Sequence, residues 1–401
     1  MQNQIPNNWQ KVKLGEVAED VRNLYEPKKT ENLSYIGLEH IEQGSLRLNG
    51  IGKSSETKSS KKIFKENDIL FGTLRSYFRK IVKPKFSGVC STDIAVIRAK
   101  ENNDQNFLFY FMANPYFINF ASSPGEGTKM PRAKWSYLSE TEWFIPKFEE
   151  QKRIGLILSS FDDKIELNNK ISKTLEKMAS AIFKEWFLKF RFPGWEKTEF
   201  FDSEIGKIPK GWETKLIKDF GETVTGKTPS TEDKTNFGSD YPFITIPDLN
   251  NIFIIKTERY LSNKGACKIK SLILPKNTIC VSCIATVGLV GITVRESYTN
   301  QQINSIIPSK EYYLYYLFNF FKTKKKDLEM FGSGGTATLI INKTKFEILE
   351  IIKPDDIILN KFYLLVKPMY EKILKIILEN LKLTPLRDLL LPKLMKGEIR
   401  V

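Results

Sequence analysis

The residues with the clearest chemical pattern are Gly221–Ser230, "GETVTGKTPS", which begin with a match to the nucleotide-binding pattern GxxxxGK[ST]. A working phosphate loop joins a buried strand to a helix, because the helix N-terminus and the loop amides hold the phosphates. Here Thr228 is followed by "PSTEDKTNFGSDYP", which has no apolar helical period and many helix breakers. Asp248, the candidate for the companion metal-binding carboxylate, follows a proline. The residues that surround the pattern therefore predict that this segment is a loop that does not hydrolyse nucleotides.

Other residue types that could do chemistry also lack their usual companions. Cys280 and Cys283 form a C-x-x-C in the apolar, β-rich run "NTICVSCIATVGLVGITV", and the remaining cysteines, Cys90 and Cys267, do not complete a second pair. Buried strand thiols are therefore expected in place of a zinc site. His40 is the only histidine in the sequence, which excludes mechanisms that need paired histidines.

Methyltransferase and nuclease motifs are incomplete. "NPYF" at Asn114–Phe117 lacks one proline of the N-P-P-[YF] motif of nucleic-acid methyltransferases, and no Gly-rich cofactor loop follows a strand, so we expect a helix stop there. "PDD" at Pro354–Asp356 leads into a helical pattern, where an aspartate is an ordinary cap. The sequence predicts neither a metal nor a cofactor site.

The charge balance favours a polyanionic partner. Lys and Arg number 62 against 47 Asp and Glu, which gives a formal net charge of +15. Such an excess speeds encounter with nucleic acid; the alternative is the codon bias of an AT-rich genome. No segment is typical of a signal peptide, and no apolar run approaches the roughly 20 residues that span a bilayer. We therefore expect a cytoplasmic protein with no membrane partner.

An internal repeat determines the domain organisation. The repeated pairs are "IPNNW" from Ile5 and "IPKGW" from Ile208, "FKENDIL" from Phe64 and "LPKNTIC" from Leu274, "FLFYF" from Phe107 and "YLYYL" from Tyr313, and "DDKI" from Asp162 and "YEKI" from Tyr370. The last pair is offset by 208 residues (370 minus 162). Each copy has a Pro-x-x-Trp turn, then short β-type runs broken by Gly, Pro and Asn, then a long helical pattern. The sequence predicts an α+β protein with two similar mixed α/β domains, 1–148 and 191–355 (the second including a linker), each followed by a long helix, 149–190 and 356–401.

The two helices are predicted from apolar positions that recur at three and four residues. The seam positions expected to pair are Ile154, Phe161, Ile165, Leu175, Ile182, Phe362, Met369, Ile373, Leu383 and Leu390. The wider stripes also contain Ile157, Ile171, Met178, Leu365, Ile376 and Leu386. If a pseudo-twofold axis relates the halves, the helices form an antiparallel coiled coil. The alternative is that each helix packs on its own domain.

The chain resembles the specificity subunits (HsdS) of type I restriction-modification systems over essentially its whole length. Residues 149–187 are similar to the central conserved region of that family, and "DLLLPKLMKGEIRV" from Asp388 is similar to its conserved C-terminal end. "DSEIGKIPKGWE" from Asp202, "TGKTPS" from Thr225 and "GSGGT" from Gly332 also resemble family patterns. The order and spacing of these motifs carry the resemblance.

The resemblance implies a DNA-binding function without chemistry in this chain. The globular parts would be target-recognition domains, each for one half of a split, asymmetric DNA site. The helices would set their separation and dock two modification subunits (HsdM), which carry S-adenosylmethionine and methylate adenine. Restriction subunits (HsdR) would supply ATP- and Mg-dependent translocation and cleavage. The alternatives are a stand-alone DNA-binding or methyltransferase-type protein and, from the opening pattern alone, a P-loop ATPase.

Candidate DNA-contacting residues in the first half come from a basic stretch with interleaved aromatic residues and from a Gly-rich loop. Sequence-specific binding needs phosphate contacts for registration and side chains at base edges for discrimination. The candidates are Lys58, Lys61, Lys62, Arg75, Tyr77, Arg79, Lys80, Lys129 and Arg132. The last two lie in "GEGTKMPRAK", where small residues allow close approach to phosphate.

The second half offers an opening loop, a basic run free of acids, an amide-rich turn and a second Gly-rich loop. The candidates are Lys227, Thr228, Ser230, Lys264, Lys268, Lys270, Asn300, Gln301, Ser333, Thr336 and Thr338. The turn "TNQQ" from Thr299 supplies amides that could pair with adenine, although a structural turn is an equal alternative.

Overall fold

The computed structural model describes residues 6, 8–122, 132–203, 206–332 and 339–401. The chain divides into two compact units, of which unit 1 consists of Met1–Asn168 with Leu378–Val401 and unit 2 of Asn169–Ile377. Each long helix contributes to both units. This grouping differs in kind from the four consecutive segments that the sequence predicts, and those segment boundaries stay a prediction.

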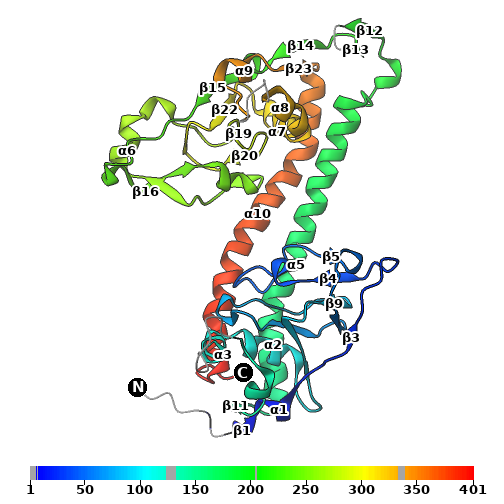
Figure 1. The fold of residues 1–401 in the computed structure, drawn as a ribbon. Coiled ribbons are helices and arrows are strands. Elements are labelled where there is room, and N and C mark those ends of the chain that lie inside the picture. Colours follow the sequence, from blue (N-terminus) through cyan, green and yellow to red (C-terminus); the bar gives the residue numbers. More distant parts are fainter. Residues whose placement is uncertain (1–5, 7, 123–131, 204–205, 333–338) are drawn as a thin grey trace. The chain divides into compact units, whose positions relative to one another are not determined.

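Two long helices confirm the strongest secondary-structure prediction (Figure 1). Helix α5 spans Phe148–Phe183 and continues through a π-helical turn, Lys184–Leu188, and helix α10 spans Asp356–Met395. In unit 1, Asn168 of α5 donates to Glu379 Oε2 of α10 at 2.8 Å, while Asp162 contacts Arg387. Because the later residue of α5 meets the earlier residue of α10, the helices are antiparallel there.

The same direction holds in unit 2. The ring of Phe362, near the start of α10, lies 6.1 Å from the Phe183 ring and 5.0 Å from the Phe187 ring. Tyr370, two turns further along α10, lies within electrostatic range of Glu176, which is earlier in α5. The helices therefore pack against each other in each unit, and they also pack against the domain core, so the two alternatives weighed from the sequence coexist.

Burial of the helix positions follows the predicted stripe only in part. Ile154, Ile165, Phe362 and Ile373 are buried, and Phe161, Leu175, Ile182, Met369, Leu383 and Leu390 are partly buried. Met178, Leu365 and Leu386 of the wider stripe are exposed, contrary to the prediction. The space is filled by other residues, namely Leu158, Ala179, Phe183, Val366, Tyr370 and Leu391. A helix that packs on two neighbours buries a broad face, and periodicity alone does not fix its edges.

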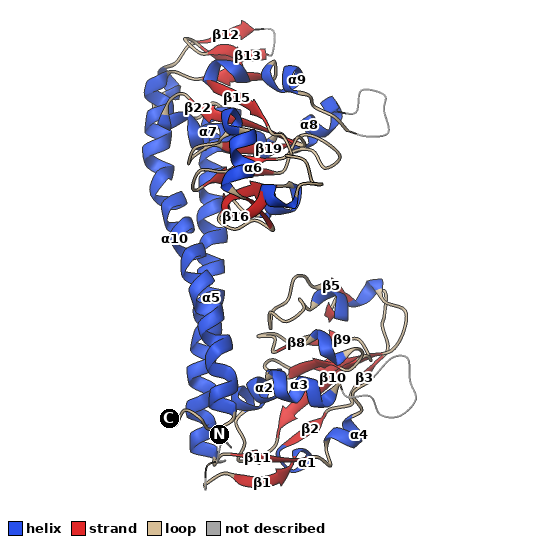
Figure 2. Ribbon diagram, turned by 90° about the vertical axis from the view of Figure 1, so that its left-hand side faces the viewer, coloured by secondary structure: helices blue, strands red, loops and turns tan. Residues whose placement is uncertain are grey.

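Unit 1 carries three small sheets beside the helices (Figure 2). The four-stranded sheet has the antiparallel order β2-β10-β7-β8, with β2 Ala18–Asp20, β10 Ile94–Ala99, β7 Ile69–Gly72 and β8 Ile81–Val82. The five-stranded sheet has the order β3-β6-β9-β4-β5, with β3 Leu24–Tyr25, β6 Lys61–Phe64, β9 Gly88–Cys90, β4 Ser34–Ile36 and β5 Gly52–Lys53. A third pair joins β1 Gln10–Lys13 to β11 Glu142–Ile145.

Unit 2 shares part of this plan and differs in the number of strands in its sheets. Its five-stranded sheet has the order β15-β22-β19-β20-β17, with β15 Gly221–Thr225, β22 Ile303–Pro308, β19 Ile279–Ser282, β20 Val290–Thr293 and β17 Phe253–Ile254. The pair β14 Glu213–Leu216 and β23 Glu350–Lys353 corresponds to β1 and β11. The three-stranded sheet is β18-β16-β21, with β18 Arg259–Leu261, β16 Phe237–Ile244 and β21 Tyr298–Thr299, and a hairpin joins β12 Phe200–Ser203 to β13 Gly206–Pro209. The shared strand order supports the repeat found in the sequence.

Short helices complete both units. In unit 1 these are α1 Leu14–Val17, α2 Gln105–Ala113, α3 Pro115–Ala121 and α4 Trp135–Leu138. In unit 2 they are α6 Asn263–Lys268, α7 Leu314–Thr323, α8 Lys325–Gly332 and α9 Lys343–Glu347. Helix α2 contains the aromatic repeat "FLFYF", and α7 contains its counterpart "YLYYL" except for Tyr313, which ends the 3-10 turn Glu311–Tyr313. Nearly all residues of both helices are buried. In each unit this helix packs between the sheet and the long helices.

Asn114 both ends α2 and begins α3. Its side chain accepts a hydrogen bond from Tyr116 N at 3.2 Å, and Pro115 occupies the first turn of α3. The "NPYF" residues thus form the expected helix stop, and a cap as well. At the start of α10, Asp355 rather than Asp356 accepts the capping bond from Ile357 N, at 2.7 Å.

Candidate nucleic-acid interface

The basic stretch of unit 1 is largely bound to the protein itself. Lys61 is buried and its Nζ donates to Ser59 O at 2.5 Å. Lys62 Nζ donates to Ile94 O at 2.9 Å, and Lys80 Nζ donates to Leu38 O at 2.6 Å. Lys58 is exposed. The side chains of Lys61, Lys62 and Lys80 are therefore bound to backbone carbonyls of the unit. The Lys58 side chain extends into solvent.

One turn of unit 1 presents side chains outward from a fixed backbone. It follows β7 and contains a short 3-10 helix, Ser76–Phe78, flanked by Arg75 and Arg79, both in the left-handed region at φ 51°. Such a conformation is costly for a residue other than glycine and persists where the surroundings impose it. Arg75 and Tyr77 are exposed, Tyr77 to 50%. We call Arg75–Arg79 the αL turn.

Ser76 and Arg79 anchor the αL turn to the rest of unit 1. The Ser76 hydroxyl is buried and lies 2.9 Å from the Ser122 hydroxyl. Arg79 Nε donates to Ala113 O, at the end of α2, at 2.7 Å, and its guanidinium faces Asp388 of α10. Burial lowers the pKa of Arg79, and Asp388 opposes that effect. These contacts favour an anchoring role for Arg79, although the prediction that it contacts DNA remains untested.

Arg132 borders the same turn. Its backbone bridges Leu74, and its Nη2 lies 2.6 Å from Asp93 Oδ1. Its side chain is about half exposed. The bridge to Leu74 places Arg132 next to Arg75, the first residue of the αL turn. Lys129 lies outside the described residues.

Unit 2 repeats the αL turn without its arginine. Ala285 follows β19 and has φ 64°, and the preceding Ile284 bridges Ile340, as Leu74 bridges Arg132. Two offset positions thus share an unusual backbone conformation while one carries Arg75 and the other only a methyl group. The candidates Ser333, Thr336 and Thr338 lie outside the described residues.

The "GETVTGKTPS" residues form a strand and a loop. Residues 221–225 are β15, and no α-helix follows in the loop, which leads only to a 3-10 turn, Lys234–Asn236. A Cβ on Gly226 would lie 2.2 Å from Asn300 O and 2.3 Å from Thr299 O, so this glycine permits close packing of two backbones. Close backbone packing thus explains this glycine. A phosphate loop needs a helix directly after it, and this loop has none.

This loop brings several sequence candidates together in unit 2. Thr228 Oγ1 donates to Gln301 Oε1 at 2.7 Å, and Lys227 N donates to Thr299 O at 3.0 Å. Lys227, Ser230 and Gln301 are exposed. Asn300 is buried and its amide donates to Gln302 Oε1 at 3.0 Å, as a structural turn requires. Lys227, Thr228 and Gln301 form one polar surface, the β15 loop surface, in which Thr228 is partly buried.

The basic run at α6 is not free of acids in space. Lys264 and Lys268 lie 3.2 and 3.0 Å from Asp233 Oδ2, which corrects the expectation from the sequence. A hydrogen bond from Thr235, followed by the two lysines, holds the pKa of Asp233 far below its usual range. The remaining residue of the run, Lys270, is exposed. Asp233 precedes Lys268 by 35 residues, which a local charge count does not detect.

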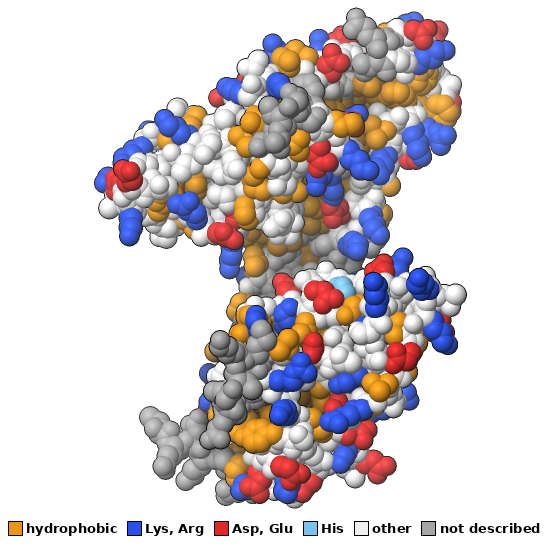
Figure 3. Space-filling view, viewed as in Figure 1, with side chains coloured by type: hydrophobic (Ala, Val, Ile, Leu, Met, Phe, Trp, Pro, Cys, Tyr) orange, Lys and Arg blue, Asp and Glu red, His pale blue; other side chains and the backbone are white. Residues whose placement is uncertain are grey.

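Groups suited to covalent or metal chemistry are not assembled among the described residues. No cluster of three potential ligands from His, Cys, Asp and Glu occurs in that part of the chain. Burial raises the pKa of the Cys280 thiol to about 12 and that of Cys283 to about 11, so both stay protonated and unreactive. Basic and acidic side chains are interspersed over the face seen in Figure 3. The geometry suits hydrogen bonding and charge contacts at exposed turns.

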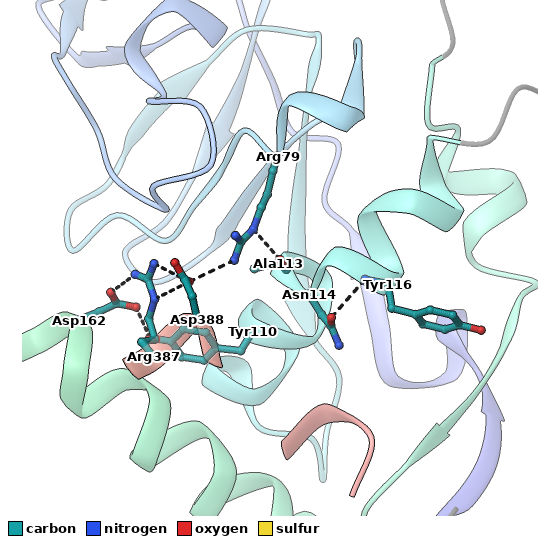
Figure 4. A network of polar contacts seen from close by, with 8 residues as sticks. All are labelled: Arg79, Tyr110, Ala113, Asn114, Tyr116, Asp162, Arg387 and Asp388. Carbon is teal, nitrogen blue, oxygen red and sulfur yellow. Dashed lines mark hydrogen bonds and ion pairs between the residues drawn. The ribbon is translucent and has the colours of Figure 1, made fainter. Parts of the chain in front are cut away.

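A polar cluster in unit 1 has no counterpart in the sequence predictions (Figure 4). Arg387 of α10 is fully buried; it contacts Asp162 of α5 through Nη1, and its Nη2 donates to Asp388 Oδ1 at 2.9 Å. Tyr110 of α2 donates its hydroxyl to Asp162 Oδ2 at 2.6 Å, and its pKa is raised well above the usual range, first by burial. Burial disfavours the charge of Arg387, but Asp162 and Asp388 together raise its pKa. The sequence signal that could have indicated this cluster is that charged residues lie within the apolar patterns of the two long helices.

Comparison with known proteins identifies the class. Residues 6–177 and 209–361 match the family model of the type I restriction modification DNA specificity domain. The specificity subunit of the type I restriction enzyme HindI from Haemophilus influenzae is 33% identical, over 98% of this chain and 100% of that protein. The MjaIX specificity subunit from Methanocaldococcus jannaschii is 27% identical, over 94% of this chain and 86% of that protein.

A solved structure shares the fold. The crystal structure of the type I restriction-modification S subunit from M. genitalium has a TM-score of 0.61 at 15% identity, over 98% of this chain and 97% of that one. The chain belongs to the family of type I restriction-modification DNA specificity subunits. It is accordingly a non-catalytic subunit that confers DNA sequence specificity and works with other subunits. No helix among the described residues is long and apolar enough to cross a membrane.

Proposed function

We propose that the chain recognises a bipartite, asymmetric double-stranded DNA site, with one half bound by each unit. The observation that carries this proposal is the repeated strand order, β2-β10-β7-β8 and β15-β22-β19-β20, with an αL turn after the third strand of each order. Two units with the same plan but different exposed residues suit two half-sites of different sequence. The αL turn of unit 1 and the β15 loop surface of unit 2 are the proposed contact regions.

An exchange of one domain tests this proposal. Replacing residues 1–148 by the matching segment of a relative with a different target is expected to change one half of the methylated sequence and leave the other half unchanged. Each half is bound by one unit, so the change stays local. Methylation-sensitive sequencing of host DNA measures the result. Alteration of both halves, or of neither, contradicts the proposal.

The proposed partners are two HsdM modification subunits and HsdR restriction subunits, in the cytoplasm. By this proposal the partners bind S-adenosylmethionine, ATP and Mg, and this chain binds none of them. Support for two equivalent HsdM sites comes from exposed apolar residues at repeat positions. Leu156 and Leu364 are 208 residues apart (364 minus 156), as are Met178 and Leu386, and all four are between 46% and 67% exposed. Each unit thus exposes one residue of each pair, which suits two copies of one partner.

A charge placed at one of these leucines is expected to remove one partner copy. Leu156→Glu and Leu364→Glu should each reduce the complex from two HsdM subunits to one, because a carboxylate is costly to bury at an apolar interface. Native mass spectrometry of the assembled complex measures the stoichiometry. Leu167→Glu, an exposed leucine of α5 whose repeat position is Lys375, is the matched control and should keep two copies. Two copies in both test variants would refute the assignment.

A further inference from the structure

The positions that correspond in unit 2 to the charged residues of this polar cluster of unit 1 carry no charge. With the offset of 208, Asp162 corresponds to Tyr370 and Arg387 to Ala179 (387 minus 208). Both are fully buried, and the Tyr370 ring stacks on Tyr315 at 4.2 Å. Unit 2 therefore packs its helices at this level with an aromatic stack. The fold does not require a buried ion pair here, and replacement of such pairs by apolar residues is often neutral for stability.

The charges of unit 1 lead outward to the αL turn. Arg387 shares the carboxylate of Asp388, and Asp388 Oδ1 lies 3.9 Å from Arg79 Nη2. Figure 4 shows the contact between Arg79 and Asp388. Arg79 is the last residue of the turn that exposes Arg75 and Tyr77. A chain of contacts thus connects α5, α10 and the turn within one unit.

Asp388 is the compensating charge for an otherwise unsatisfied group. Among the described residues, Arg79 Nη2 is buried and has no hydrogen-bond partner. A buried cationic nitrogen without compensation is costly, so loss of the facing carboxylate favours movement of Arg79 toward water. Arg79 has left-handed backbone angles, which relax readily once the side chain is released. The turn would then move together with Arg75 and Tyr77.

We propose that Asp388 and Arg387 of α10 are positioning residues for DNA recognition by unit 1, because they tie the αL turn to the helix pair. This inference rests on the proposed function, in which unit 1 binds one half-site. In unit 2 the position of Arg79 is Gly288 (79 plus 209, the offset of the strand residues Ile81 and Val290 after the turn), which also has a positive φ but no side chain. The position of Asp388 is Ser180. The device therefore belongs to one half of the molecule, and its loss has a one-sided effect.

The test uses the complex assembled with its modification subunits. Methylation rates are measured on duplexes that carry single base changes in either half-site. Asp388→Asn removes the charge at a side chain that is 40% exposed, and it is expected to reduce discrimination in the half-site of unit 1 by about tenfold. Discrimination in the other half-site is expected to stay unchanged. Asp388→Glu keeps the carboxylate and should restore discrimination.

Two further variants separate positioning from stability. Asp163→Asn is the matched control, because Asp163 is also an exposed carboxylate of the helix pair in unit 1, bound to Lys85 at 2.7 Å and not to the turn. Its profile should equal that of the wild type. The double variant Asp162→Asn/Arg387→Met should show the one-sided loss even where its thermal unfolding matches the wild type.

Several results would overturn the inference. These are an Asp388→Asn profile equal to that of Asp163→Asn, a loss spread over both half-sites, and a loss that Asp388→Glu does not restore. Failure of the proposed function is distinguishable, because base changes would then not separate into two halves even for the wild type. That outcome overturns both proposals.

Discussion

Arg387→Ala is expected to lower the free energy of unfolding of unit 1 by about 3 to 5 kcal/mol. The side chain is fully buried, and its removal leaves Asp162 facing a cavity with only the Tyr110 hydroxyl as partner. The Asp162 side chain is only 24% exposed, so its charge is costly without the facing cation, and the lost packing of the arginine stem adds to that cost. Denaturant unfolding followed by hydrogen exchange of α2 measures the change, because α2 belongs to unit 1.

The double variant Asp162→Asn/Arg387→Met separates charge from packing. Both charges are gone, methionine fills much of the arginine volume, and the amide oxygen introduced by Asp162→Asn can still accept from Tyr110. More than half of the loss should therefore be regained. Arg153→Ala, at an exposed arginine of α5 in the same unit, should stay within about 0.5 kcal/mol of the wild type. A loss below about 1 kcal/mol for Arg387→Ala would mean that Asp162 is hydrated, and the buried ion pair would not be a structural element.

The repeat and the long helices could be predicted from the sequence because both are periodic. The offset between "DDKI" and "YEKI" places equivalent positions, and apolar spacing at three and four defines α5 and α10. The edge of the buried face could not be predicted. Met178 and Leu386 fit the spacing as well as Ile165 does, but only the neighbouring domain determines which of them is covered.

The candidate contact residues were less predictable, because the charge of a lysine does not reveal its partner. Lys80 reaches Leu38 O, 42 positions away in the chain, and Lys268 reaches Asp233, 35 positions away. A stretch rich in lysine thus combines residues that hold loops together with others that face solvent. The αL turn was equally hidden, since arginine carries no sequence signal for a positive φ of the kind that glycine or asparagine gives. Ala285 has the same geometry, again with no signal in its residue type.

Arg75→Ala is expected to weaken binding of the assembled complex to its DNA site by about 1 to 3 kcal/mol and to relax discrimination in the half-site of unit 1. Arg75 is the exposed first residue of the αL turn, so removal of its side chain creates no cavity. Alanine is also compatible with the backbone, because Ala285 adopts φ 64° at the corresponding place in unit 2, against φ 51° for Arg75. The loss of affinity is therefore attributable to the guanidinium group.

The salt dependence of binding shows what Arg75 contacts. A base contact lowers affinity for the specific site while the slope of log K against log salt stays the same, whereas a phosphate contact reduces that slope by about 1 and weakens binding to every sequence alike. Fluorescence anisotropy with specific and scrambled duplexes, at several salt concentrations, separates the two. Lys58→Ala, at another exposed cation of unit 1, provides the comparison for a change of charge alone. Equal affinity of Arg75→Ala and wild type at all salt concentrations would remove Arg75 from the interface and leave Tyr77 as the exposed contact of the turn.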